Sequence, residues 1–162
     1  MNLGNRRITN DELAHAFQRL GYTNPTPYQA SGNVILPDAI SVDNDHLRSG
    51  LEDELGYDVP VFVRSGDHVR ELVGSPFAGQ RGDAGGKPQV VFLGEETSAV
   101  LEEVFGPGDR FTLVGTEIHW LPCGGLAETG DLHKRLDLSV GPNTVRTLGT
   151  IERIAKKLPD SP

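Results

Sequence analysis

The chain has 162 residues, of which 36% are hydrophobic and 23% charged, and its formal net charge is −8. This length and composition are typical of one globular domain or of two closely packed subdomains. The acidic charge argues against nucleic-acid binding, which depends on clustered Lys and Arg side chains.

The sequence contains no apolar run near the roughly 20 residues that cross a bilayer, and its first residues lack the apolar core of a signal peptide. The single cysteine, Cys123, forms no internal disulfide and fits a reducing compartment. We therefore expect a cytoplasmic protein without membrane association. Because Cys123 precedes two glycines, we interpret it as a residue beside a turn rather than as a nucleophile.

Capping signals and apolar spacing predict three helices in the first half of the chain. Thr9 and Glu12 form a capping box for a helix over 10–20. A second helix is expected within 43–56, and Ser65 caps a short third helix.

The stretch 28–36 is predicted to be a strand that organises the rest of the chain. Gly32 inside a strand indicates a bulge or the close approach of a ligand, and it is flanked by the polar Ser31 and Asn33. Two interpretations remain open: these side chains form a binding patch, or they satisfy neighbouring backbone groups.

A second strand is predicted over 59–64, where β-branched residues end in Arg64. An arginine beside a helix N-terminus suits an anion. The alternative, which we favour, is that Arg64 pairs with one of the many carboxylates nearby in the sequence.

Residues 78–88 are rich in glycine but do not form a P-loop. Arg81 stands where the first glycine of that motif would lie, and Pro88 follows Lys87 in place of Ser or Thr. We interpret the stretch as a flexible linker between an N-terminal subdomain, 1–77, and a C-terminal subdomain, 89–162.

The second half alternates strand and helix patterns, so the predicted fold class is α+β with antiparallel or mixed sheets. Its expected elements are a strand over 89–93, a helix over 97–105, a hairpin of 111–114 with 117–121, a helix over 129–137 and a final helix over 148–157.

Several segments occur in an order shared with one family. They are Tyr28 with Ser31-Gly32-Asn33-Val34, Val59-Pro60-Val61 running to Arg64, Pro76-Phe77, Val91-Phe92-Leu93, and Thr144 and Arg146 with Thr150-Ile151. On these residues the chain resembles the bacterial domain-of-unknown-function family 1697 over nearly all of its length. The resemblance implies two α+β subdomains with ferredoxin-like character, and it implies no activity.

Two departures from the family pattern matter. Similar proteins begin with an apolar strand that ends in a Leu-Arg-Gly-Ile-Asn-Val-Gly-Gly type of segment, whereas Met1 stands near the end of that strand. Either the translated start lies upstream, or the sheet lacks a strand and exposes an edge that favours a homodimer. Near the C-terminus, Arg146-Thr147-Leu148 replaces an Arg-Asn-Trp pattern, which removes an aromatic stacking surface.

The predicted site consists of Ser31, Asn33, Arg64 and Arg146, provided that the fold brings them together. Two arginines beside an amide would hold a phosphate or carboxylate bidentately, so a module that binds a small anion is the favoured function. Neither a metal nor a cofactor is expected. One alternative is an interaction protein that oligomerises and has no small-molecule site. The other is a hydrolase or transferase, for which the sequence identifies no nucleophile and base.

Overall fold

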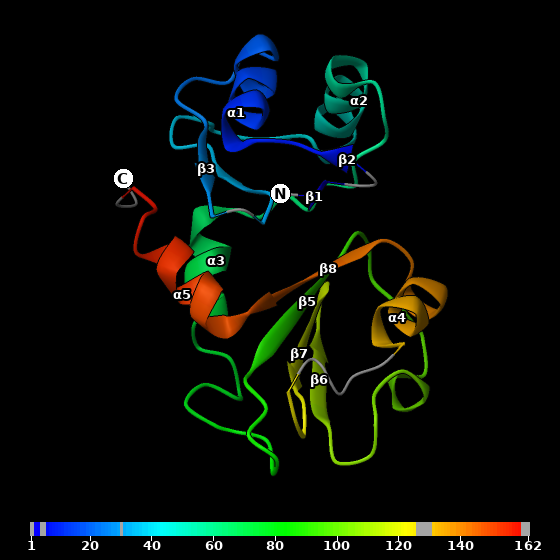
Figure 1. The fold of residues 1–162 in the computed structure, drawn as a ribbon. Helices are drawn as coiled ribbons and strands as arrows, with labels where there is room; N and C mark the ends of the chain where they lie inside the picture. The colour runs from blue at the N-terminus through cyan, green and yellow to red at the C-terminus, as the bar shows by residue number, and fades with distance from the viewer. Residues whose placement is uncertain (1, 4–5, 30, 126–130, 160–162) are drawn as a thin grey trace. The chain divides into compact units, whose positions relative to one another are not determined.

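The computed structural model describes residues 2–3, 6–29, 31–125 and 131–159, and the chain divides into two compact units (Figure 1). Unit one comprises Met1–Val63 and Leu158–Pro162, and unit two comprises Arg64–Lys157. Helices and antiparallel strands occur in both units, so the predicted α+β class is confirmed. The boundary between the units falls before Arg64, whereas the sequence had suggested 78–88.

The described part of unit one contains two helices and two short hairpins. They are β1 (Asn2–Leu3), β2 (Arg6–Arg7), α1 (Asn10–Arg19), β3 (Thr26–Tyr28), β4 (Asn33–Ile35) and α2 (Asn44–Leu55). The predicted capping box is present, since Thr9 Oγ1 accepts from the Glu12 backbone N–H and the Glu12 carboxylate accepts from the Thr9 N–H. Leu13 and Phe17 of α1 pack with Leu47 and Leu51 of α2 in the core of this unit.

The prediction of a single strand over 28–36 is wrong. The stretch is a hairpin in which Tyr28 of β3 pairs with Asn33 of β4. Gln29 and Gly32 have φ angles of 57° and 75°, and this left-handed backbone reverses the chain between the strands. The polar cluster that resembled an interruption in one strand is therefore a turn.

The strand predicted over 59–64 is also absent. Within the described residues no ladder forms along this stretch, and the Val63 N–H donates instead to Asn44 Oδ1 at 3.3 Å. Val59 is nevertheless buried. β-branched composition suits a pleated sheet, but a strand forms only where a second backbone pairs with it.

Unit two is built on a four-stranded antiparallel sheet with the order β6-β7-β5-β8 (Figure 1). Its elements are α3 (Gly66–Leu72), β5 (Gln89–Leu93), the 3₁₀ turn η1 (Leu101–Glu103), β6 (Arg110–Val114), β7 (Glu117–Leu121), α4 (Leu132–Val140), β8 (Asn143–Thr147) and α5 (Leu148–Ala155). The sequence did not predict β8. Ferredoxin-like character stays a prediction, because η1 occupies the first connection of this sheet where that fold has a helix.

The helix expected over 97–105 is reduced to η1. Leu101, Val104 and Phe105 are buried as expected, but Val100, which was expected to face inward, is 57% exposed. A short helix with β-branched residues is marginal, and one 3₁₀ turn already buries the apolar side chains. The helix expected over 129–137 is observed as α4, and residues 129–130 lie outside the described residues.

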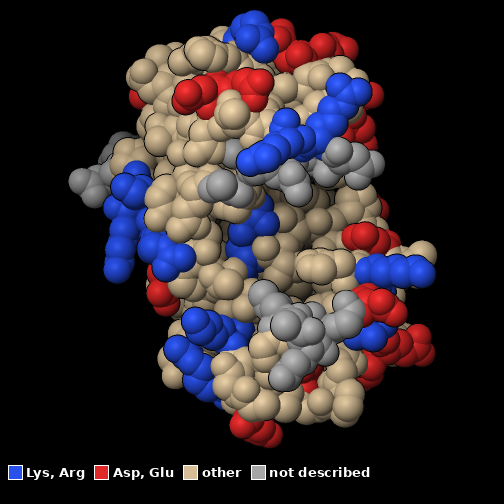
Figure 2. All heavy atoms as spheres, viewed as in Figure 1, with Lys and Arg blue, Asp and Glu red and all other residues tan. Residues whose placement is uncertain are grey.

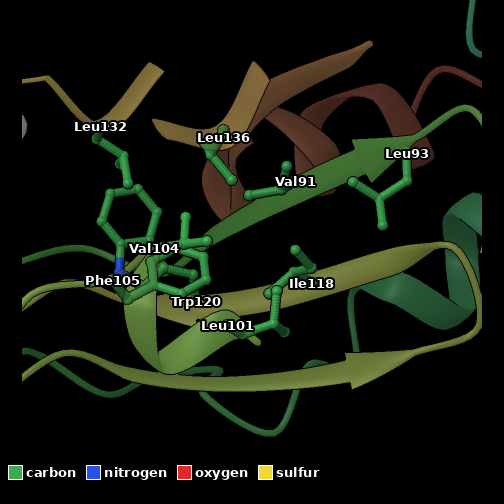
Figure 3. Packing of buried hydrophobic residues seen from close by; sticks show 9 residues of the cluster. All are labelled: Val91, Leu93, Leu101, Val104, Phe105, Ile118, Trp120, Leu132 and Leu136. Atoms are coloured by element: carbon green, nitrogen blue, oxygen red, sulfur yellow. The ribbon is translucent and has the colours of Figure 1, made fainter. Parts of the chain in front are cut away.

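One face of the sheet carries the larger hydrophobic core. Figure 3 shows Val91 of β5 and Ile118 and Trp120 of β7 pointing toward Leu132 and Leu136 of α4. Because side chains alternate along a strand, the residues between them face the opposite side of the sheet. The ionisable side chains of β7 and β8 therefore lie on that second face.

The glycine-rich stretch predicted as a linker lies within unit two and packs closely on another loop. The N–H groups of Ala84 and Gly86 donate to the Cys123 carbonyl at 2.8 and 3.2 Å. A Cβ atom at Gly82 or at Gly86 would stand 1.9 Å from the Pro122 carbonyl oxygen. Glycine is required at these positions because two backbones touch there.

We expect the substitution Gly86→Ala to lower the free energy of unfolding by about 1–3 kcal/mol, because one of the two loops must move. Urea denaturation measures the loss. Gly125→Ala is the matched control: a Cβ atom there meets nothing within 4 Å, so the effect should stay within about 0.5 kcal/mol. Equal effects of the two substitutions would show that the close approach is unimportant.

Candidate functional site

The second face of the sheet in unit two is polar, and strand register identifies its residues. Val90 of β5 lies opposite His119 on one side and Arg146 on the other. Phe92 lies between Glu117 and Thr144 in the same way. Directly paired residues share a face, so two ionisable residues of β7 and the arginine of β8 lie on one surface.

Glu117 is the buried centre of this surface. Its side chain is 3% exposed, and its Oε1 accepts from Arg64 Nε at 2.5 Å. The His68 ring nitrogen Nε2 lies 3.0 Å from Oε2. Each carboxylate oxygen thus has a basic side chain as its partner, and the Arg64 guanidinium compensates the cost of burying the charge.

Arg64 is positioned by several contacts besides the carboxylate. Its Nη2 donates to the Leu93 carbonyl at 2.9 Å and to Thr116 Oγ1 at 3.0 Å, and its guanidinium lies 5.6 Å from the centroid of the Phe92 ring. Arg64 thus pairs with a carboxylate, as expected, but the partner is the distant Glu117 and not a carboxylate nearby in the sequence.

Helix α3 brings Arg64 and His68 to the same carboxylate. Ser65 is its N-cap, and its Oγ accepts from the His68 N–H, as the sequence predicts. Arg64 precedes this cap and His68 lies in the first turn, so both side chains extend from one helix end.

A second polar pair lies beside Glu117. His119 Nδ1 is 3.0 Å from Ser75 Oγ, and both residues are buried. Burial lowers the pKa of His119, and the nearby Glu117 carboxylate opposes that shift only in part. A serine next to a histidine is the pairing that a hydrolase uses, but Ser75 is buried, with 6% of the residue exposed. The pair connects the turn after α3 to the sheet.

Arg146 lies on the same face, one strand away from Phe92. Its Nη1 donates to Thr144 Oγ1 at 2.6 Å and to the Val145 carbonyl at 2.9 Å. Burial lowers the pKa of Arg146, although an arginine remains protonated at neutral pH. Thr144, to which Arg146 donates, pairs with Phe92, and the Arg64 guanidinium lies over the ring of that phenylalanine.

The predicted residues Ser31 and Asn33 lie in the hairpin of unit one. Asn33 Nδ2 donates to Ser31 Oγ at 2.7 Å and to the Tyr28 carbonyl at 3.4 Å, contacts that stabilise the turn. Arg64 and Arg146 belong to unit two. The convergence of all four residues, and their role in binding, stay predictions.

Sequence reasoning missed Glu117, His68, His119 and Ser75. One signal was available: Glu117 and His119 alternate with the apolar Ile118 and Trp120 along the predicted strand 117–121. Ionisable residues at alternate positions of a buried strand indicate a polar inner face. Their partners on and after α3 lie 44 to 49 residues away, beyond the reach of pattern analysis.

Other kinds of site receive less support. No group of three or more His, Cys, Asp or Glu side chains in the described residues is placed to hold a metal ion. A shallow hollow of about 440 Å³ lies between α3 and α5, lined by Arg70, Val73, Glu152, Ala155 and Lys156. In Figure 2, Lys and Arg occur in several separate groups on the face shown, interspersed with acidic residues. No helix in the described part of the chain is long and apolar enough to span a bilayer.

The pattern of the family "Protein of unknown function (DUF1697)" matches residues 1–119, which include the segment from Arg64 to His119. The chain belongs to the DUF1697 family. This confirms the family resemblance, although the match ends within β7, so Arg146 and the elements from α4 onward lie outside it. Comparisons with curated proteins and with solved structures gave no match.

We expect Glu117→Gln to lower the free energy of unfolding by about 3–5 kcal/mol, because it leaves the Arg64 guanidinium without a buried counter-charge. Chemical denaturation measures the loss. Asp58→Asn is the control, since Asp58 pairs bidentately with Arg48 on the surface, where solvent screens the charges. A loss no greater than that of the control would mean that Glu117 does not organise this face.

We expect stability to fall with pH below 6.5 because of His119. Its pKa is lower in the folded chain than its ordinary value of 6.5, so the unfolded chain binds the proton first and protonation favours unfolding. The loss approaches at most about 1.4 kcal/mol per pH unit for one proton. Unfolding measured between pH 7 and about 5, above the range where carboxylates titrate, should show a shallower slope for His119→Gln. His15→Gln removes a histidine from an exposed position and is the matched control; an equal change of slope in it would contradict the assignment to His119.

Proposed function

We propose that unit two binds a small anion, a metabolite that carries a phosphate or carboxylate group, on the polar face of its sheet. The observation that carries the proposal is that Arg146 donates to Thr144 Oγ1, and that Thr144 pairs with Phe92, over whose ring the Arg64 guanidinium lies. Guanidinium and hydroxyl donors at one place suit the oxygens of such a ligand.

The two arginines have different roles in this proposal. Glu117 neutralises the charge of Arg64, so Arg64 organises the polar face of the sheet and adds little net positive charge to it. We assign the attraction of the ligand to Arg146, whose guanidinium donates to Thr144 Oγ1 and to the Val145 carbonyl. Its partial burial favours binding, because an ionic hydrogen bond is stronger where water is partly excluded.

The proposal is confined to unit two and does not require Ser31 or Asn33. Catalysis is not part of it, because the serine and histidine that lie together are buried. The alternative of an interaction protein is supported by a different surface, the outer edge of the same sheet.

We expect inorganic phosphate, pyrophosphate or a tricarboxylate to raise the melting temperature of the wild-type protein. At a ligand concentration of 100 times the dissociation constant, the stabilisation is about 2.7 kcal/mol, which corresponds to several degrees. Arg146→Gln should weaken binding about 10- to 100-fold, the loss of one hydrogen-bonded charge. Arg146→Lys should lose part of the affinity, because lysine keeps the charge but not the planar fork.

Arg153→Gln is the matched control, because it removes the same charge from an exposed position on α5 of the same unit. Sodium chloride at equal ionic strength separates specific binding from general screening. If no anion stabilises the wild type more than chloride does, or if Arg153→Gln weakens binding as much as Arg146→Gln, the proposal fails.

A further inference from the structure

Strand β6 forms an open edge of the sheet in unit two. It pairs with β7 along its whole length, from Arg110 opposite Leu121 to Val114 opposite Glu117. In the described part of the chain, no strand pairs with its other side. An unpaired edge presents a row of backbone donors and acceptors to any second strand.

This edge lacks the features that usually protect an edge strand. Its five residues include no proline, glycine or lysine, and the exposed fractions of Leu113 and Val114 are 38% and 54%. The charged residues at its start are engaged within the chain. The Asp109 carboxylate accepts from the N–H groups of Gly106 and Cys123, and the Arg110 guanidinium lies 5.7 Å from the centroid of the Phe77 ring.

Hairpin geometry indicates which backbone groups point outward. Two residues, Gly115 and Thr116, connect Val114 to Glu117, and Gly115 has the positive φ of a tight turn. The pair that closes a two-residue hairpin exchanges both of its hydrogen bonds, and bonded pairs then alternate along the ladder. Val114, Thr112 and Arg110 therefore direct their N–H and C=O groups to β7. Phe111 and Leu113 direct theirs outward.

We infer that β6 pairs antiparallel with β6 of a second copy of this chain, with the two-fold axis at Thr112. A continuous sheet requires that paired residues face the same side, so a residue on the axis meets its own copy. With Thr112 on the axis, all five residues of the strand are paired. Phe111 then lies opposite Leu113 of the other copy, and these are the residues with outward backbone groups.

The charge on the strand does not oppose a second copy at this edge, although the whole chain is acidic. The strand carries one charge, Arg110, which lies opposite Val114 of the other copy in this register. No like charges face each other across the axis, and the apolar side chains of Leu113 and Val114 become covered. The inference is independent of anion binding, because it uses the edge of the sheet and not Arg146.

A charge exchange at the axis tests the dimer. Thr112 is exposed, so Thr112→Glu and Thr112→Lys each place like charges directly opposite one another without altering the core. Sedimentation velocity should give twice the chain mass of 17.5 kDa for the wild type, the single chain mass for each variant alone, and a dimer for the two variants mixed. Ser98→Glu, an exposed change outside the sheet, should leave the dimer intact.

Three results would overturn the inference. The first is a wild type that is still monomeric at about 1 mM, because a dissociation constant above about 1 mM means association too weak to be specific. The others are variants that remain dimeric and monomeric variants that do not combine when mixed. Far-ultraviolet circular dichroism confirms that each variant is folded before its mass is interpreted.

A disulfide provides a second test that does not rely on repulsion. Thr112 and its copy would form a non-hydrogen-bonded pair with a Cα separation of about 4.5 Å, which lies within the range for a disulfide. In a Cys123→Ser background, Thr112→Cys should form a covalent dimer under mild oxidation. Ser98→Cys in the same background should not. Equal cross-linking of the two variants would mean random collision and would contradict the register.

Discussion

Glu117 places a carboxylate in a strand whose five residues are all buried, and the polar side of unit two depends on how that charge is compensated. Arg64 and His68, one on each carboxylate oxygen, provide the compensation. Both residues come from the N-terminal end of α3, so the carboxylate also fixes where that helix lies on the sheet. Buried ion pairs add little net stability compared with an apolar core, but a buried charge without its partners is costly. This asymmetry restricts α3 to one position.

The sheet of unit two separates three kinds of surface by strand geometry. One face is apolar and packs against α4, and the other carries the ionisable residues beneath α3 and around Arg146. The outer edge at β6 has unpaired backbone groups and partly exposed Leu113 and Val114. Face and edge are geometrically independent, so a ligand on the polar face and a second chain at the edge would not compete. One four-stranded sheet thus accommodates both proposed interactions.

Local signals in the sequence predicted those elements whose causes are local. The capping box at Thr9, the cap at Ser65 and the two-residue turn at Gly115 each involve neighbouring residues, and all are observed. Predictions failed where a partner backbone decides the outcome. The stretch 59–64 has strand composition but forms no ladder, and β8 forms a ladder without a clear strand pattern. Strands depend on pairing between distant segments, which composition reports only weakly.

The candidate site divides in the same way. The sequence by itself determined the α+β class, the family and the helix ends, and it identified Arg64 and Arg146 as candidate site residues. Residue type and near-neighbour spacing carry that information. Only the tertiary structure decided that Arg64 is paired with Glu117, 53 residues away, and that Arg146 shares its face of the sheet. The physical reason is the range of the interactions: a helix cap is settled within one turn of the chain. The partner of a buried charge is settled only when α3 packs on the completed sheet.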